Sequence, residues 1–269
     1  MCDLCPSNSP QIMSASPMSV SAFTYACIRP TDAPTTTADL VCMDTKLVVE
    51  EAEGKSKEYG CDGVFDVVVE PTDIYGTVFG VNEVECPRSL LTMIDSSTSM
   101  CLCFMGPSEG GKTAMFQGVG EANHGAVGWV SDEMFRLLGE KEPLANGLYR
   151  STVTVSYYEM YDETIKDLLS PENKDLVVSM DIEQGYSVKG MSKHPCAHAG
   201  DLKAKLEYGR KSRNTAMLST GLASQSTGAF FEITLRQEEG TSVQSLTSTT
   251  CKCLLVDVPS TTKLVGGAR

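Results

Sequence analysis

The segment CLCFMGPSEGGKTAMFQG, residues 101–118, limits the folds open to this 269-residue chain more than any other. It contains a glycine, four residues, and then glycine, lysine and threonine: Gly106, Gly111, Lys112 and Thr113. An apolar, strand-like run enters the glycine-rich turn, and the residues after it have the composition of a helix. A strand, a glycine-rich loop and a helix in this order are typical of a loop that wraps phosphates. We therefore predict a phosphate-binding loop here.

The predicted loop consists of Gly106, Pro107, Ser108, Glu109, Gly110, Gly111, Lys112 and Thr113. In such loops the backbone N–H groups point at the phosphates, the lysine reaches the outer phosphates, and the hydroxyl of the last residue holds Mg²⁺. We therefore assign Thr113 as the metal ligand. Pro107 lacks one N–H group, and Glu109 places a carboxylate near the bound phosphates. Like charges about 4 Å apart repel each other by about 1 kcal/mol in water, and by several times more at lower dielectric. The sequence predicts weakened nucleotide binding.

The cysteines predict packing rather than metal binding. There are eleven of them and no secretory signal, which favours reduced thiols in the cytosol. Alternation within apolar runs puts each C-x-C pair on one face of a strand, where free cysteine usually packs as a small buried apolar residue. The two pairs are Cys101/Cys103 and Cys251/Cys253. Two other groups fall short of the four ligands of a zinc site: Cys2 with Cys5, and His194, Cys196 and His198 in a predicted loop.

The negative net charge disfavours partners that are themselves polyanions. The net charge of −13 disfavours nucleic acid, which is bound through a basic surface, and disfavours other polyanions in the same way.

No run of eighteen apolar residues exists, so we expect no membrane span and a cytoplasmic location. The Ser-, Pro- and Met-rich residues 1–18 are predicted to be a disordered tail.

Strand-like and helix-like patterns alternate along the rest of the chain. Apolar, β-branched runs predict strands at 19–28, 63–70, 100–105, 151–161, 228–237 and 252–258. Helical spacing predicts helices at 87–97, 128–140 and 199–216, and the charged residues 50–60 are interpreted as a linker. Such alternation indicates an α/β fold of the P-loop NTPase type, with a central, mostly parallel sheet and helices on both faces.

The stretch VSYYEMYDETIKDLLSP, residues 155–171, resembles the signature strand of kinesin motor domains. Other segments resemble the same family in the same order along residues 19–269, which we interpret as one motor-like domain: ACIRP, CDGVFD, FMGPSEGGKTAMFQG and YSVKGMS. The resemblance implies a kinesin-like fold, binding of ATP or ADP with Mg²⁺, microtubules as partner, and a cytoskeletal location. It also adds Arg29, Pro30, Ser224 and Asp257 to the predicted nucleotide site.

The departures from the family concern its two switches. GRKSRNTAMLSTGLASQSTGAFFEITL (209–235) resembles switch I, but Ser226 replaces the arginine. LLVDVPSTTKL (254–264) resembles switch II, but Ser260 replaces the glycine that senses the γ-phosphate and Thr262 replaces the glutamate. In the family this arginine and glutamate form the ion pair that closes the site around the attacking water. The resemblance therefore implies ATP hydrolysis that is weak or absent, and we assign no catalytic residue.

Several alternatives remain open. The chain stops soon after switch II, before the helices with which the family contacts microtubules, so we expect this chain to bind microtubules weakly. A compensating basic patch around Lys189, Lys193 and His194 would oppose that expectation. The rival interpretations are an active ATP-driven motor with unusual switches, a nucleotide-free interaction or scaffold module in which Lys112 packs or pairs with an acid, and another P-loop NTPase. The last leaves 155–171 and 209–235 unexplained. Cargo, direction and oligomeric state leave no signal in the sequence.

Overall fold

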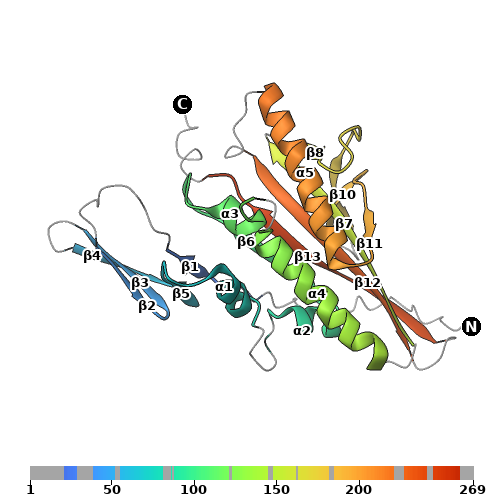
Figure 1. The fold of residues 1–269 in the computed structure, drawn as a ribbon, viewed down its shortest axis with the longest axis horizontal. Coiled ribbons are helices and arrows are strands. Elements are labelled where there is room, and N and C mark those ends of the chain that lie inside the picture. Colours follow the sequence, from blue (N-terminus) through green and yellow to red (C-terminus); the bar gives the residue numbers. More distant parts are fainter. Residues whose placement is uncertain are drawn as a thin grey trace, which may run out of the picture. The chain divides into compact units, whose positions relative to one another are not determined.

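A mixed six-stranded sheet carries the predicted phosphate loop (Figure 1). Its strand order is β11-β7-β12-β13-β6, with β8 paired to β7. The strands are β6 (Met100–Phe104), β7 (Tyr149–Tyr161), β8 (Thr164–Asp167), β11 (His194–Cys196), β12 (Gly228–Gly240) and β13 (Leu246–Asp257). Because helices alternate with these strands along the chain, the α/β class is confirmed.

The structure, a computed structural model, describes residues 21–28, 39–51, 55–80, 86, 88–120, 123–144, 148–161, 163–181, 185–220, 227–240 and 245–260. The chain divides into two compact units. The first comprises Met1–Ala26 with Thr37–Val64, and the second comprises Cys27–Thr36 with Phe65–Arg269. The predicted tail, residues 1–18, lies outside the described residues.

The expectation of a mostly parallel sheet is wrong in the described pairings. β13 pairs parallel to β6, whereas β7 with β8, β11 with β7, β12 with β7, and β12 with β13 are antiparallel. The physical reason is the length of the connections. Only residues 241–245 join β12 to β13, and so short a connection returns the chain antiparallel, because a parallel pair needs a long crossover. β6 and β13 are far apart in sequence, which leaves room for one.

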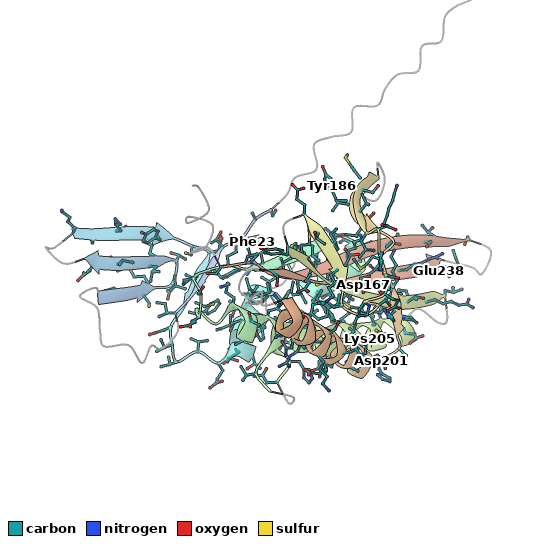
Figure 2. The ribbon with its side chains drawn as sticks, turned by 90° about the horizontal axis from the view of Figure 1, so that it is seen from above. Phe23, Asp167, Tyr186, Asp201, Lys205 and Glu238 are labelled. Atoms are coloured by element: carbon teal, nitrogen blue, oxygen red, sulfur yellow. The ribbon has the colours of Figure 1, made fainter. Side chains whose placement is uncertain are left out.

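Three described helices pack against the sheet and against one another. They are α3 (Lys112–Gln117), α4 (Gly125–Leu144) and α5 (Ala199–Thr220). Figure 2 shows Lys205 of α5 on one side of the sheet and Tyr186 of β10 (Gly185–Lys189) on the other. Side chains under the helices are buried at alternate positions of β12, including Phe231 and Ile233. This face of the sheet, the helix face, carries the core; we call the opposite face the outer face.

One glycine sets how closely α5 approaches the sheet. A Cβ atom on Gly209 would lie 2.1 Å from Cδ1 of Tyr157, a fully buried residue of β7. No side chain fits in that space, which is why a residue with low helix propensity occupies the middle of this helix.

The predicted helices agree with the structure. Residues 87–97 contain α2 (Leu90–Ser96), 128–140 lie within α4, and 199–216 lie within α5. The apolar positions picked out by helical spacing are buried: Val130, Met134, Leu137, Leu138, Leu202 and Leu206. A further helix, α1 (Pro71–Val78), was not predicted.

Most residues of two small sheets, which the sequence analysis partly missed, belong to the first unit. β2 (Asp39–Met43), β3 (Lys46–Glu51) and β4 (Lys55–Gly60) form an antiparallel sheet, and β1 (Tyr25–Cys27) pairs with β5 (Gly63–Phe65). The interpretation of residues 50–60 as a linker is therefore wrong for β4. Every residue of β4 is exposed, so the strand has no apolar alternation by which it could be recognised.

The two C-x-C pairs have opposite environments. Cys251 and Cys253 are buried on the helix face of β13, as predicted. Cys101 and Cys103 are exposed, so the prediction of burial is wrong for this pair. β6 lies at the end of the strand order, and its two cysteines alternate with the partly buried Leu102, which packs against the core. The cysteines therefore lie on the outer face.

The signature segment 155–171 is stabilised by a buried carboxylate. Asp167, at the end of β8, is fully buried and accepts hydrogen bonds from the backbone N–H groups of Leu169 (2.9 Å), Ser170 (3.0 Å) and Ser192 (2.9 Å) and from Nδ2 of Asn173 (3.0 Å) (Figure 2). A buried carboxylate is tolerated when such donors satisfy its oxygens. The residue therefore joins the β7–β8 hairpin to the segment after the β9–β10 hairpin, in which β9 (Val177–Asp181) pairs with β10.

Candidate nucleotide site

The predicted phosphate loop connects the end of β6 to the start of α3. Gly106 has φ +144° and Gly111 has φ +80°, backbone conformations that favour glycine. Glu109 adopts φ +64°, which costs a residue with a side chain about 1–2 kcal/mol. Its side chain is exposed. The two glycines thus have a conformational reason to be present, and Glu109 occupies a position where glycine would be unstrained.

Lys112 folds back over the loop that precedes it. Its Nζ donates a hydrogen bond of 2.7 Å to the carbonyl oxygen of Pro107. Within the part of the chain that the structure describes, no acid pairs with this ammonium group, in contrast to one of the alternatives above. A hydrogen bond to a single carbonyl is readily exchanged for one to a phosphate oxygen, which as a charged acceptor binds an ammonium group more strongly.

Thr113 and Asp257 come together although they are 144 positions apart in the sequence. The hydroxyl of Thr113 donates to Oδ2 of Asp257 over 2.8 Å. Asp257 ends β13, where it stands opposite Phe104 of the parallel strand β6, and the N–H of Val258 donates to the carbonyl of Phe104 (3.1 Å). Because β6 and β13 are parallel, their carboxyl ends meet at one edge of the sheet, the usual place for ligands in α/β proteins. Hydroxyl and carboxylate oxygens are suitable ligands for Mg²⁺, so the residues present fit the predicted ion.

A second contact joins the loop to the segment after β13. The hydroxyl of Ser108 donates to Oγ of Ser260 over 2.8 Å, and Ser260 is buried. The resemblance to the family aligns Ser260 with its γ-phosphate-sensing glycine. The serine therefore contributes a side-chain hydrogen bond to the phosphate loop that a glycine could not make.

Behind the loop lies a buried charge cluster that the sequence analysis did not assign to the site. Nη1 of Arg213, on α5, lies 3.6 Å from Oδ2 of Asp257, and its Nε lies 3.4 Å from Oε2 of Glu159 on β7. Nη2 donates to the backbone oxygen (3.0 Å) and the hydroxyl (2.9 Å) of Thr227. All three charged residues are at least nine-tenths buried. One feature of the sequence could have indicated this cluster: Glu159 is the single acid in the otherwise uncharged run 151–160.

The structure brings together most of the predicted site and leaves part of it untested. The loop residues 106–113 and Asp257 converge at the carboxyl ends of β6 and β13. Arg29, Pro30 and Ser224 lie outside the described residues, as do Ser226 and Thr262, which the resemblance aligns with the family's switch arginine and glutamate.

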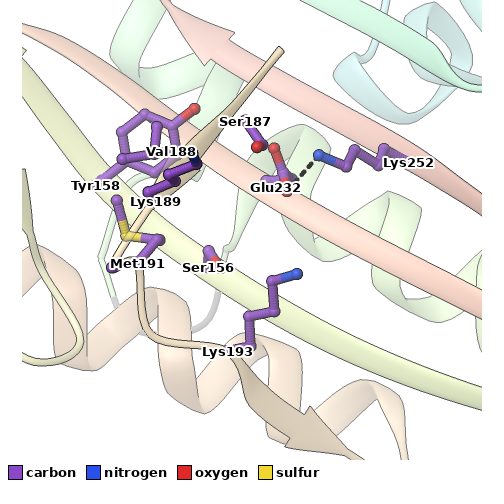
Figure 3. A pocket seen from close by; sticks show the side chains of 10 residues that line it. Ser156, Tyr158, Ser187, Val188, Lys189, Met191, Lys193, Glu232 and Lys252 are labelled. Atoms are coloured by element: carbon purple, nitrogen blue, oxygen red, sulfur yellow. Dashed lines mark ion pairs between the residues drawn. The ribbon is translucent and has the colours of Figure 1, made fainter. Parts of the chain in front are cut away.

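A separate cavity of about 260 Å³ lies on the outer face, between β10 with the residues after it and the sheet (Figure 3). Lys189 and Lys193 line it together with Lys252, whose Nζ lies 3.2 Å from Oε1 of Glu232. Two residues of the predicted basic patch therefore do lie close together. His194 is not among the lining residues; burial and the neighbouring Lys205 lower its pKa below the usual value.

In the described part of the chain, no group of three or more His, Cys, Asp or Glu side chains is placed to hold a metal ion. None of the described helices is long and apolar enough to cross a membrane.

The fold and the arrangement of the loop define an α/β protein of the P-loop NTPase type. Comparison with known proteins narrows this class: the sequence profile described as "Kinesin motor domain" matches residues 29–264. The chain therefore belongs to the kinesin motor domain family, and the resemblance stated from the sequence is confirmed.

Individual relatives are distant. Kinesin heavy chain of Caenorhabditis elegans is 32% identical over 112 residues, 42% of this chain and 13% of the relative. Kinesin-like protein KIN-14J of Oryza sativa subsp. japonica is 28% identical over 178 residues, 65% of this chain and 20% of the relative. A solved structure of a fast kinesin matches with a TM-score of 0.77 at 20% identity, covering 93% of this chain and 68% of that one. The chain thus matches a fifth or less of the length of these two curated relatives.

Proposed function

We propose that this domain binds ATP or ADP with Mg²⁺ at the loop 106–113 and associates with microtubules, while ATP hydrolysis and stepping are lost. Kinesin motor domains bind these nucleotides and microtubules. The observation that carries the proposal for this chain is the hydrogen bond between Thr113 and Asp257 beside a complete phosphate loop. We propose that the family-derived positions Arg29, Pro30 and Ser224 complete the nucleotide site.

Each residue of the loop has a defined role in this proposal. The backbone N–H groups after Pro107 bind phosphate oxygens, and Lys112 exchanges its carbonyl partner for the outer phosphates. Thr113 and Asp257 hold Mg²⁺, which neutralises phosphate charge. Glu109 opposes binding through its charge, an effect that its exposure reduces.

Substitutions in the loop test nucleotide binding directly. We expect Lys112→Ala to weaken ADP–Mg²⁺ binding by about 10- to 150-fold. This factor corresponds to the loss of one hydrogen bond to a charged group, about 1.5–3 kcal/mol. Glu109→Gly is expected to tighten binding several-fold, because it removes both a negative charge and a strained backbone position. Glu109→Gln removes the charge and keeps the strain, so it separates the two causes. Isothermal calorimetry measures each affinity.

Lys174→Ala is the matched control, since Lys174 is an exposed lysine away from the loop and should leave the affinity unchanged. If neither the wild type nor Glu109→Gly binds nucleotide, the loop has no phosphate-binding role. The nucleotide-free scaffold would then be the better interpretation.

We propose that microtubule binding by this chain is weak, because its charge of −13 repels an acidic partner. Only a minor fraction of the protein should pellet with stabilised microtubules at physiological salt. Lys189→Glu/Lys193→Glu should abolish this residual binding if the outer-face cavity provides the contact, whereas Lys55→Glu on β4 serves as the control. Tight co-sedimentation of the wild type at physiological salt would contradict the proposal.

A further inference from the structure

A side-chain hydrogen bond joins the middle of the phosphate loop to the segment that follows β13. Oγ of Ser108 donates to Oγ of Ser260 over 2.8 Å. Ser260 comes three residues after Asp257 and is only 1% exposed, so its hydroxyl lies in the interior of the protein. The two side chains therefore leave no gap between the loop and this segment at the point where they meet.

The two residues before Ser260 hold this segment in place. The N–H of Val258 donates to the carbonyl oxygen of Phe104 at the end of β6 (3.1 Å). Pro259 has a fixed φ, and its ring packs against the start of β12, where a Cβ atom on Gly228 would lie 3.3 Å from Cδ of the proline. Moving Ser260 away from the loop would therefore disturb contacts with β6 and β12 as well as the hydrogen bond itself.

The position of this contact bears on the number of phosphates that the site accepts. In P-loop NTPases the loop and its lysine cradle the β- and γ-phosphates, and Mg²⁺ is held by the loop hydroxyl and by an aspartate. Thr113 and Asp257 are the matching pair in this chain. The switch segments are ordered by contacts with the γ-phosphate and Mg²⁺, and residues 254–264 resemble switch II. A third phosphate therefore needs the space between the loop and the segment that carries Ser260, whereas ADP lacks that phosphate.

A third phosphate and the contact between the two serines exclude each other by distance. Two hydroxyls that both donate to one phosphate oxygen over about 2.7 Å stand about 4–5 Å apart, whereas the two serine oxygens are 2.8 Å apart. Glu109, the next residue of the loop, adds a repulsion that is larger for ATP than for the less charged ADP. We propose that the hydrogen bond between Ser108 and Ser260 makes the site selective for nucleoside diphosphates over triphosphates, an inference that rests on the proposed nucleotide binding.

The test compares two nucleotides on the full chain by isothermal calorimetry. The probes are ADP–Mg²⁺ and AMP-PNP–Mg²⁺, a non-hydrolysable analogue of ATP. Wild-type protein should bind ADP at least about 5-fold more tightly than AMP-PNP. Ser260→Ala removes the hydroxyl and Ser260→Gly removes the whole side chain. Each should shift the ratio of the two affinities toward AMP-PNP by about 5- to 10-fold, the upper part of the range for one neutral hydrogen bond.

Ser97→Gly is the matched control. Ser97 lies before β6, at the end of that strand opposite to the loop, and its φ of +50° suits glycine, so the ratio of the two affinities should stay at the wild-type value. The wild-type ratio tests the inference even where a variant fails to fold.

The outcomes separate this inference from the proposed function. If wild-type protein binds neither nucleotide, the proposed function fails and the inference fails with it. If ADP binds but AMP-PNP binds equally tightly, the nucleotide site stands and the selectivity is refuted. A ratio that stays at the wild-type value in both Ser260 variants would show that the hydrogen bond does not cause the selectivity, and this too would overturn the inference.

Discussion

Replacing Arg213 by methionine is expected to lower the free energy of unfolding by about 3–5 kcal/mol, the range for removing one partner of a buried ion pair. Arg213 is 3% exposed and stands between the carboxylates of Glu159 and Asp257. Methionine has a similar length but no charge, so both carboxylates would remain buried without their cation. Thr227 would also lose two hydrogen bonds.

Urea unfolding compares the variants. Arg136→Met is the matched control, because Arg136 pairs with Glu133 and Glu140 on the exposed surface of α4, where such pairs contribute about 0–1 kcal/mol. Arg213→Met/Glu159→Gln should recover part of the loss, since it removes one of the two unpaired charges. A loss no larger than that of Arg136→Met would show that the cluster contributes little.

Wild-type protein is expected to release phosphate from ATP at least about 10³-fold more slowly than an active kinesin motor, the lower end of the contribution of one transition-state arginine. The reason is that the resemblance aligns Ser226 with the family's switch arginine and Thr262 with its switch glutamate. Phosphoryl transfer depends almost entirely on positioning and charge stabilisation, so the loss of both residues removes most of what such a site contributes.

A repair series tests whether the switches are the cause. Ser226→Arg alone adds a charge without a partner, and Thr262→Glu alone adds an acid near phosphates, so each should leave turnover at background. The double variant restores the ion pair but keeps Ser260, which is buried and bonded to Ser108 of the phosphate loop. We expect it to recover little, and the triple variant with Ser260→Gly to recover most.

Single-turnover phosphate release provides the measurement. Lys112→Ala in the triple variant is the control, since regained turnover that survives it would come from a contaminant. Because the motor domain's relatives extend well beyond the length of this chain, the series is best repeated in any longer form of the protein. A wild-type rate equal to that of an active kinesin would refute the loss of hydrolysis.

The sequence by itself determined the α/β class, the phosphate loop and the family. These follow from local patterns: glycines at fixed spacing around Lys112, the run 155–171, and helical spacing in α4 and α5. Such patterns can be recognised in a sequence because a few neighbouring residues determine the backbone conformation and the buried face of one helix, strand or loop. For the same reason β4, which buries nothing, was mistaken for a linker.

Only the tertiary structure decided which residues meet. Thr113 reaches Asp257 across 144 positions of sequence, and Arg213 joins Asp257 to Glu159, because β13 lies between β6 and β12 and α5 packs over β7. The lengths of the connections likewise set the direction of the strands. The tertiary structure also decided that Cys101 and Cys103 are exposed on β6, at the end of the strand order. Alternation tells which side chains share a face of a strand, but whether that face is covered depends on elements far away in the chain.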